Sequence, residues 1–214
     1  MPPSYVRLRY ARPVTTRFLL ELVDGGDRLV GREPTRAEVV AAAPKLVAFY
    51  NEPYNQAMLA HEEALTVKDV VAHYRSLASE GSRPFLLELD GLLVGDGDLR
   101  HLEKDRAEVA ILIGERAVQG KGLGTRFGVM LHAFAFRTLG LRRLYASIIP
   151  ANAASLRLFA KLGYEGDDTP AARRYIDEPD DVTLSLTAER FDALHGALAA
   201  RLKISPLKAT PNGQ

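Results

Sequence analysis

The chain has 214 residues, of which 47% are hydrophobic and 26% are charged, and its 28 lysines and arginines nearly balance its 27 aspartates and glutamates. This composition is typical of a globular protein with a sizeable core, and the net charge of +1 excludes a bulk electrostatic attraction to nucleic acid or to an anionic membrane. Because cysteine is absent, disulfides, thiolate metal sites, iron–sulfur clusters and a cysteine nucleophile are excluded together.

Apolar residues alternate with other residues near the start of the chain, over 5–10 and 14–23, which predicts two strands that pair as an N-terminal hairpin. The Asp-Gly-Gly-Asp sequence at 24–27 predicts a turn, and a short strand is expected over 29–32. We therefore expect β-structure before the first helix.

Two helices are predicted from their capping residues. Thr35 is followed three residues later by Glu38, and Thr66 is followed in the same way by Asp69, which is the spacing of a capping box. We expect these helices to end at about residues 50 and 79. The polar segment 51–55 between them interrupts the helical pattern.

After residue 81 the hydrophobic pattern becomes that of strands. Asp90-Gly91 predicts a tight hairpin, and the segment 107–113 is apolar on both faces, which predicts a central buried strand. The other expected strands lie over 84–89, 92–99, 143–149, from 164 onward and over 182–186. The expected helices lie over 122–139 and 152–163, with a last one through Phe191, Leu194, Leu198 and Leu202 before a polar tail from about 205. This order predicts a mixed α/β domain with one core.

Glycines at 120, 122 and 124 separate the buried strand from the helix that follows it. Glycine permits close ligand approach, and a helix N-terminus offers unpaired N–H groups, so this segment predicts a phosphate-binding loop. An ATP-binding P-loop is disfavoured because Lys121 is followed by glycine and not by serine or threonine, and the Gly-x-Gly-x-Gly spacing disfavours a dinucleotide fold. The alternative interpretation is that the glycines only make a tight connection.

The segment Gln119-Gly-Lys-Gly-Leu-Gly124 resembles the Gln/Arg-x-x-Gly-x-Gly/Ala motif with which GNAT-type N-acetyltransferases bind the pyrophosphate of acetyl-CoA. A second block, 144–164, with Asn152-x-x-Ser155 and a Leu-Gly-Tyr ending, is similar to that family's strand, Asn-x-x-Ser and Leu-Gly-Phe ending. The resemblance covers about residues 28–187. The Asn-x-x-Ser pattern is most similar to ribosomal-protein N-terminal and small-amine acetyltransferases.

The resemblance implies a mixed, mostly antiparallel sheet flanked by helices, which splays open between the strand ending near Ile113 and the strand ending near Ile149. It implies that the pantetheine of the co-substrate acetyl-CoA lies in the splay. The implied division of the chain is an N-terminal extension over 1–27, an acetyltransferase domain over 28–187, and a C-terminal helix with a polar tail over 188–214. The residues implied to bind acetyl-CoA are Ile111, Leu112, Ile113, Gln119, Gly120, Lys121, Gly122, Leu123, Gly124, Thr125, Asn152, Ser155 and Phe159.

Glu108 is the first candidate catalytic residue, because many family members place a carboxylate at this distance from the motif, where it acts as a base. On a strand, Glu108, Ala110 and Leu112 share one face, so the side chain of Glu108 is expected on the same face as the thioester region. The backbone N–H of Leu112 is implied to contact the carbonyl oxygen of the thioester. The competing interpretation of Glu108 is a structural glutamate paired with Arg106 or Arg100.

The second candidate catalytic residue is Ser155. Many family members have a tyrosine at the position of Phe159, where it protonates the departing thiolate, and phenylalanine has no proton to donate. Asn152, Ser155 and Phe159 share one helix face, so Ser155 is expected to replace the tyrosine. The competing interpretation is that Asn152 and Ser155 only cap the helix.

No metal site is expected, because Asp96 and Asp98 have no histidine partner and the five histidines lack ligand spacing. The acidic segment 51–63 suits a cationic amine or a solvated helix end. The last helix is compatible with docking on the domain or with a homodimer contact. Because neither a signal peptide nor a stretch of about 20 apolar residues is seen, we expect a cytoplasmic protein without membrane or nucleic-acid partners.

We therefore predict an N-acetyltransferase that moves the acetyl group of acetyl-CoA to a primary amine, of a protein N-terminus or a small molecule, by direct attack in a ternary complex. One alternative is a module that senses acetyl-CoA without turnover, and Phe159 favours it. The other is a nucleotide-binding protein.

Overall fold

The structure, a computed structural model, describes residues 16–59 and 63–207. Within these residues the strands form one sheet in the order β7-β8-β6-β5-β4-β3-β2-β1-β9. The strands are β1 (Arg17–Asp24), β2 (Asp27–Arg32), β3 (Arg83–Leu89), β4 (Leu92–Arg100), β5 (Arg106–Ile113), β6 (Arg143–Ile148), β7 (Glu165–Gly166), β8 (Val182–Thr187) and β9 (Lys203–Leu207). The helices are α1 (Arg36–Tyr50), α2 (Pro53–Met58), α3 (Val67–Ser79), α4 (Leu123–Ala133), which continues into a π-helical turn (Phe134–Thr138), α5 (Ala153–Leu162) and α6 (Ala188–Ala199).

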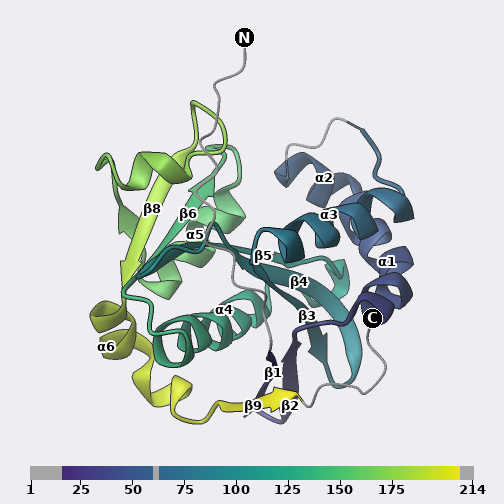
Figure 1. Ribbon diagram of the computed structural model, residues 1–214, viewed down its shortest axis with the longest axis horizontal. Helices are drawn as coiled ribbons and strands as arrows, with labels where there is room; N and C mark the ends of the chain where they lie inside the picture. Colours follow the sequence, from purple (N-terminus) through teal and green to yellow (C-terminus); the bar gives the residue numbers. More distant parts are fainter. Residues whose placement is uncertain (1–15, 60–62, 208–214) are drawn as a thin grey trace.

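The helices cover both faces of the sheet, as Figure 1 shows. On one face, Leu46 and Phe49 of α1 and Val70 of α3 pack with Leu86 of β3. On the other face α4 packs against the central strands in the main core, which includes Phe127. Neighbouring strand residues therefore serve different cores, as the alternation of side chains along a strand requires.

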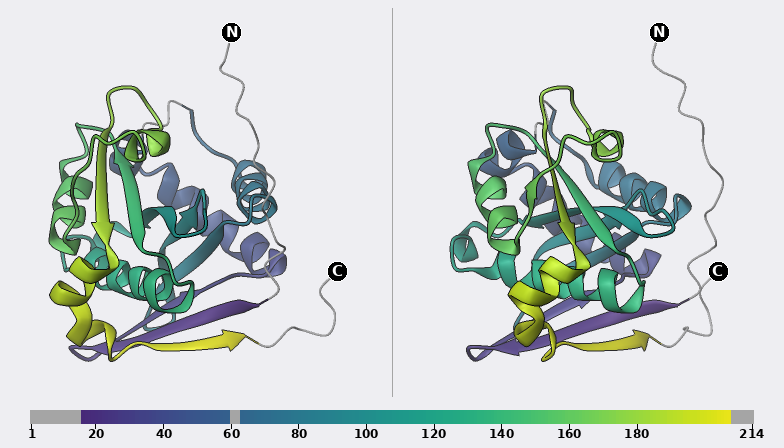
Figure 2. Two further views of the ribbon diagram at one scale, coloured as in Figure 1. Left: turned by 60° about the vertical axis from the view of Figure 1, so that its left-hand side comes forward. Right: turned by 90° about the vertical axis from the view of Figure 1, so that its left-hand side faces the viewer.

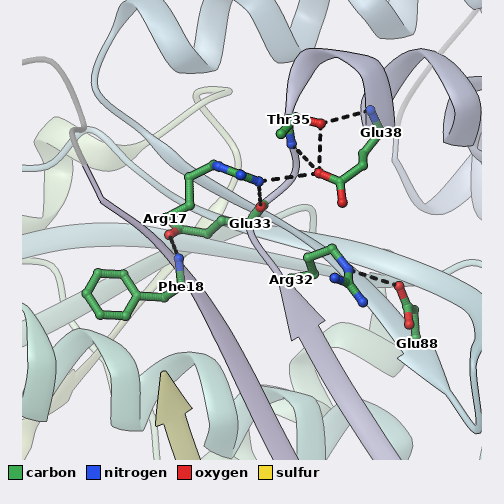
Figure 3. A network of polar contacts seen from close by, with 7 residues as sticks. All are labelled: Arg17, Phe18, Arg32, Glu33, Thr35, Glu38 and Glu88. Carbon is green, nitrogen blue, oxygen red and sulfur yellow. Dashed lines mark hydrogen bonds and ion pairs between the residues drawn. The ribbon is translucent and has the colours of Figure 1, made fainter. Parts of the chain in front are cut away.

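The predicted capping boxes are confirmed at both helix starts. The backbone N–H of Glu38 donates to Thr35 Oγ1 at 3.1 Å, and the N–H of Thr35 donates to Glu38 Oε2 at 2.6 Å. Arg17 of β1 donates to the same carboxylate, and the N–H of Phe18 donates to Glu33 Oε2 at 2.6 Å (Figure 3). The capping residues thus also fix where β1 and β2 meet α1.

The two ends of the described chain lie side by side, as Figure 2 shows. β1 pairs antiparallel with β2 and with β9, and the partner of Leu19 in β9 is Ser205. The prediction of a polar tail from about 205 is therefore wrong for residues 205–207, because their backbone completes the edge of the sheet and Ile204 packs against the core. Residues 5–10 lie outside the described residues.

The last helix docks on the domain. Phe191 of α6 is fully buried and stacks on His132 of α4, with ring centroids 5.9 Å apart. The sheet runs through all three segments into which the sequence was divided, and the boundaries of that division stay a prediction.

The sheet opens between its only parallel pair of strands in the described part of the chain, β5 and β6. Their pairing is confined to the start of each strand and ends at Glu108 and Tyr145. The predicted mixed, mostly antiparallel, splayed sheet is therefore confirmed. The short helix α2 was not predicted; Glu52 caps it, and Pro53 occupies its first turn, a favourable position for proline. Across residues 16–59 and 63–207, the helices lack the combination of length and apolar character that a bilayer span requires.

Candidate active site

Two adjoining cavities lie at the opening of the sheet. We call the first, of about 380 Å³, the glycine-loop cavity, since Gly120, Gly122 and Gly124 line it. We call the second, of about 560 Å³, the acidic groove, for the carboxylates described below. The residues that line both are Met58, Leu59, Ile111, Leu112, Asn152 and Ser155. A reaction between molecules held in the two cavities would take place at this junction.

The glycine-loop cavity is built mainly from backbone at the start of α4. Gly122 is the N-cap with φ of 79°, and it offers no side chain to the N–H groups of the first helical turn. A Cβ on Gly122 would meet nothing within 4 Å, so its glycine is required by the left-handed backbone and not by crowding. Arg157 and Lys161 of α5 line the same cavity, and the described residues that line it include no carboxylate. The cavity is therefore suited to an anion at a helix N-terminus.

The wall of this cavity formed by β5 also offers backbone groups. Ile111, Leu112 and Ile113 pair with β4 on one side, while the other side of β5 has no strand partner beyond Glu108 among the described residues. An extended ligand in the splay could pair with this free edge in the manner of an added strand.

Most of the predicted acetyl-CoA contacts are brought together here. Ile111 to Ile113, Gln119, Gly120, Gly122 to Thr125, Asn152 and Ser155 line the glycine-loop cavity. Lys121 is exposed and lines neither cavity, and Phe159 lines only the acidic groove, where it packs edge-on against Tyr164 at 4.9 Å. The contacts themselves stay a prediction.

The acidic groove is lined by carboxylates from three separate parts of the chain: Asp69 of α3, Asp96 and Asp98 of β4, and Asp177, Glu178 and Asp181 before β8. Arg100 and His73 are the basic residues among the described lining. Burial raises the pKa of Asp96 and of Asp177, and it raises the pKa of Asp98 to about 6. The groove thus has an excess of negative charge and suits a cation.

Asp96 and Asp98 differ in their partners. The hydroxyl of Tyr74 donates to Asp96 Oδ2 at 2.8 Å, and the hydroxyl of Tyr50 donates to the same oxygen. Asp98 Oδ1 has no hydrogen-bond donor, and it lies 3.4 Å from Arg100 Nε. Asp96 is therefore held in place by two hydroxyls, whereas Oδ1 of Asp98 is buried and faces the guanidinium of Arg100.

Glu108 lies behind the groove and lines neither cavity. Its side chain is 1% exposed, with Oε1 3.6 Å from Arg100 Nε and Oε2 2.9 Å from His101 Nδ1. The hydrogen bond to Glu108 raises the pKa of His101. The register places Arg100 opposite Glu108 and Asp98 opposite Ala110, so Asp98 lies two register positions closer to Leu112 at the junction. The pairing with Arg100 agrees with the structural interpretation of Glu108.

Asn152 and Ser155 have distinct places at the start of α5. Asn152 Oδ1 accepts from the backbone N–H of Ser155 at 2.9 Å, so Asn152 caps the helix. Its Nδ2 donates to the carbonyl of Met58 at 3.0 Å. Ser155 lines both cavities. The cap uses only the backbone of Ser155, which leaves its hydroxyl at the junction.

From the sequence, Asp96 and Asp98 were interpreted only as possible metal ligands, and the acidic groove was not predicted. Their alternation with Arg100 along one strand was the available signal, because it places all three on the face of Glu108. Asp69 and the 177–181 carboxylates gave no such signal, since only the fold brings them to β4. In the described part of the chain, no group of three or more histidines, aspartates or glutamates is arranged to hold a metal ion.

Comparison with known proteins adds family evidence to this geometry. The family described as acetyltransferase (GNAT) domain matches residues 28–165. Human alpha/beta-tubulin-N-acetyltransferase 9 is 32% identical over 108 residues, 50% of this chain and 44% of that protein. The N-acetyltransferase 9-like protein of Caenorhabditis briggsae is 32% identical over 95 residues, 44% of this chain and 45% of that protein. The match thus spans less than half of each relative.

Solved structures with the same fold are more distant in sequence. Aminoglycoside acetyltransferase AAC(6')-Ib in complex with coenzyme A aligns with a TM-score of 0.63 at 20% identity, over 77% of this chain and 98% of that one. RimJ of Mycobacterium smegmatis in complex with CoA-disulfide gives 0.61 at 20% identity, over 87% and 96%. Spermidine N-acetyltransferase of Vibrio cholerae, with CoA and spermine, gives 0.60 at 16% identity, over 76% and 97%.

Proposed function

The chain belongs to the acetyltransferase (GNAT) family, and from that premise we propose that it moves the acetyl group of acetyl-CoA to a primary amine of a small polycation by direct attack in a ternary complex. The observation that carries this proposal is the meeting of two cavities of opposite character, one suited to an anion and one to a cation, at six shared residues.

The glycine-loop cavity fits acetyl-CoA. The N–H groups at the start of α4 and the cations Arg157 and Lys161 would hold the pyrophosphate, and the free edge of β5 would pair with the pantetheine. Acetyl-CoA supplies the activated acetyl thioester. Its reacting carbon would then lie near Leu112. The carbonyl of Leu112 points toward Gly95 of β4, and in an antiparallel pair the N–H of the same residue points the same way. The proposed donor to the thioester carbonyl oxygen, as negative charge develops there, is therefore the N–H of Ile111 or Ile113 on the free edge and not that of Leu112.

The acidic groove supports the choice of acceptor. Six carboxylates against Arg100 and His73 attract a molecule with several protonated amines more strongly than a peptide with one α-amine. Two structural neighbours were solved in complex with molecules that carry several amines, spermine and kanamycin, which agrees with this choice. The α-amine of a protein N-terminus is the alternative acceptor against which the polycation is tested.

The groove also supplies groups for the proton transfers. The amine must lose a proton before or as its nitrogen forms a bond to the acetyl carbon, and the carbon–sulfur bond then breaks to release a thiolate. We assign the acceptance of the amine proton to Asp98, which lines the groove and whose pKa burial raises to about 6. We assign to the hydroxyl of Ser155, at the junction, the stabilisation of the departing thiolate. Glu108 acts on the proton acceptor indirectly, through the guanidinium of Arg100 that it shares with Asp98.

The test is release of free thiol from acetyl-CoA across a panel of spermidine, kanamycin, propylamine and a short peptide with a free α-amine. We expect kcat/KM for spermidine or kanamycin to exceed that for propylamine and the peptide by at least about tenfold, and KM to rise with salt because the attraction is electrostatic. A preference for the peptide would contradict the polycation proposal. Tight CoA binding without turnover on any amine would instead support an acetyl-CoA sensor, the alternative that Phe159 favours.

A further inference from the structure

A directed chain of polar side chains joins the glycine loop to α2. The guanidinium of Arg116 donates to Gln119 Oε1, and Gln119 Nε2 donates to Asn55 Oδ1 at 3.0 Å and to the carbonyl of Ile113. Asn55 Nδ2 then donates to the carbonyls of Phe49 at 2.9 Å and Gly114 at 3.0 Å. Asn55 is 1% exposed, so its amide is satisfied mainly by these bonds within the protein.

The orientation of both amides follows from their partners. Carbonyl oxygens can only accept, so the Nδ2 group of Asn55 must face Phe49 and Gly114, and the Nε2 group of Gln119 must face Ile113. This leaves Asn55 Oδ1 as the acceptor for Gln119. Each member of the chain fixes the next, and a buried polar network that is fully satisfied specifies one geometry. The first residue of the predicted phosphate motif thus uses its side chain to hold protein, not ligand.

The same helix is attached to the loop at its surface. Arg116 lies over the ring of Tyr54, 4.0 Å from its centroid, and 3.8 Å from the carboxylate of Glu52, the N-cap of α2. Since Arg116 belongs to the segment that leads into the glycine loop, its side chain holds α2 from outside while Asn55 holds it from within.

The other end of α2 is attached across the splay. The carbonyl of Met58 accepts from Asn152 Nδ2 at 3.0 Å, and Asn152 caps α5. Met58 and Leu59 line both cavities. The helix therefore spans from the end of β5 to the start of α5 and ends at the junction where the acetyl group would be transferred.

We propose that Asn55 is a positioning residue: through Gln119 it sets the shape of the glycine loop, and through α2 it sets where Met58 and Leu59 stand between thioester and acceptor. This inference rests on the proposed function, because it takes the glycine-loop cavity as the acetyl-CoA site. CoA bound at the loop would stabilise α2, so the acceptor should bind more tightly after CoA than before it.

The test is a double-mutant cycle read out as the Kd for CoA by calorimetry. Asn55→Ala and Gln119→Ala should each weaken CoA binding about tenfold, the effect of one or two buried hydrogen bonds. Because both side chains act in one chain, the double variant should bind CoA about as weakly as the weaker single variant, not about a hundredfold more weakly than wild type. Should Asn55→Ala fail to fold, Gln119→Ala carries the test, since it leaves the bonds of Asn55 to Phe49 and Gly114 intact.

Asn51 provides a matched control. Its amide exchanges two hydrogen bonds of 2.8 Å with the backbone of Leu65 and touches neither cavity, so Asn51→Ala should lower Tm and leave the CoA Kd unchanged. At the far end of α2, Asn152→Asp keeps the cap on α5 but loses the donor to Met58, and should raise the KM for spermidine more than it lowers kcat. Equal CoA affinity of Asn55→Ala, Gln119→Ala and wild type, or additive losses, would overturn the inference alone. Wild-type protein that binds no CoA would overturn the proposed function and the inference with it.

Discussion

The glycine-loop cavity and the acidic groove meet at the same residues but are built in opposite ways. The first is formed largely by one continuous segment, from Ile111 to Thr125, with α2 and α5 around it, and it offers backbone groups and cations. The second is assembled from α1, α3, β4, β6 and the segment before β8, and it offers carboxylates on side chains. In one molecule, therefore, the cavity proposed to bind the co-substrate offers mainly backbone groups, and the groove proposed to select the acceptor offers charged side chains.

Of the substitutions that test this difference between the two cavities, we expect the one at Asp98 to have the largest effect on kcat. Asp98→Asn should lower kcat about 10²–10⁴-fold, because it removes the proposed proton acceptor. Since the pKa of Asp98 is about 6 and the base must be ionised, kcat/KM of wild type should fall as pH drops through about 6, and this dependence should be absent from the variant. The measurement is the pH profile of kcat/KM with spermidine.

Asp177→Asn is the matched control, because it removes one negative charge from another wall of the groove. It should raise KM for spermidine and change kcat little. If Asp98→Asn behaved in the same way as this control, Asp98 would be one more attracting charge and not the base.

The corresponding substitution in the glycine-loop cavity is Gly122→Asp. It forces a side chain into a left-handed backbone and adds a negative charge where phosphate is proposed to bind, so CoA affinity should fall by about a hundredfold or more. Gly25→Asp is matched, since Gly25 also has positive φ and open space around its Cβ but lies in the turn between β1 and β2. Both variants should lose stability, and only Gly122→Asp should lose the rise in Tm that CoA produces. A normal CoA shift in Gly122→Asp would contradict the assignment of the loop.

Ser155 tests the junction itself. The helix cap needs only the backbone N–H of Ser155, so Ser155→Ala should fold as wild type does. If the hydroxyl stabilises the departing thiolate, kcat should fall about tenfold, which is less than the effect typical of general-acid catalysis. CoA should bind within about twofold of wild type. Single-turnover kinetics with saturating acetyl-CoA separate the two quantities. An unchanged rate would remove Ser155 from the mechanism.

How far the sequence predicts each region follows from how each is built. Most strands and both capping boxes follow from local patterns: the Asp90-Gly91 turn, the Thr35–Glu38 spacing and the apolar strand that ends at Ile113. The splay does not follow from a local pattern and is implied by the family resemblance. The glycine loop is local. The acidic groove is not, because Asp69 and Asp181 are more than a hundred residues apart and only the fold brings both to β4. β9 also could not be predicted, since a five-residue segment that contains Pro206 has no strand signal until β1 offers an edge.

The smallest effect, and the one that sharpens the acidic side most, is expected from Glu108→Gln. Glu108 shares Arg100 with Asp98, and the charge of Glu108 raises the pKa of Asp98. Removing that charge while keeping the shape should lower the pKa of Asp98, so the acid limb of the kcat/KM profile should move to lower pH, with only a few-fold change in its plateau.

Glu103→Gln is the control, an exposed glutamate paired with Arg174 on the neighbouring loop, and its profile should match that of wild type. A plateau loss in Glu108→Gln as large as in Asp98→Asn would mean that Glu108 takes the proton itself, as the strand pattern first suggested. Such a base would matter most for an amine with a pKa near ~10.4, of which almost none is neutral at pH 7, and less for an α-amine near ~7.8. Comparing propylamine with the peptide acceptor in both variants therefore decides which carboxylate acts on the amine, because only the variant that lacks the base should lose more rate on the more basic acceptor.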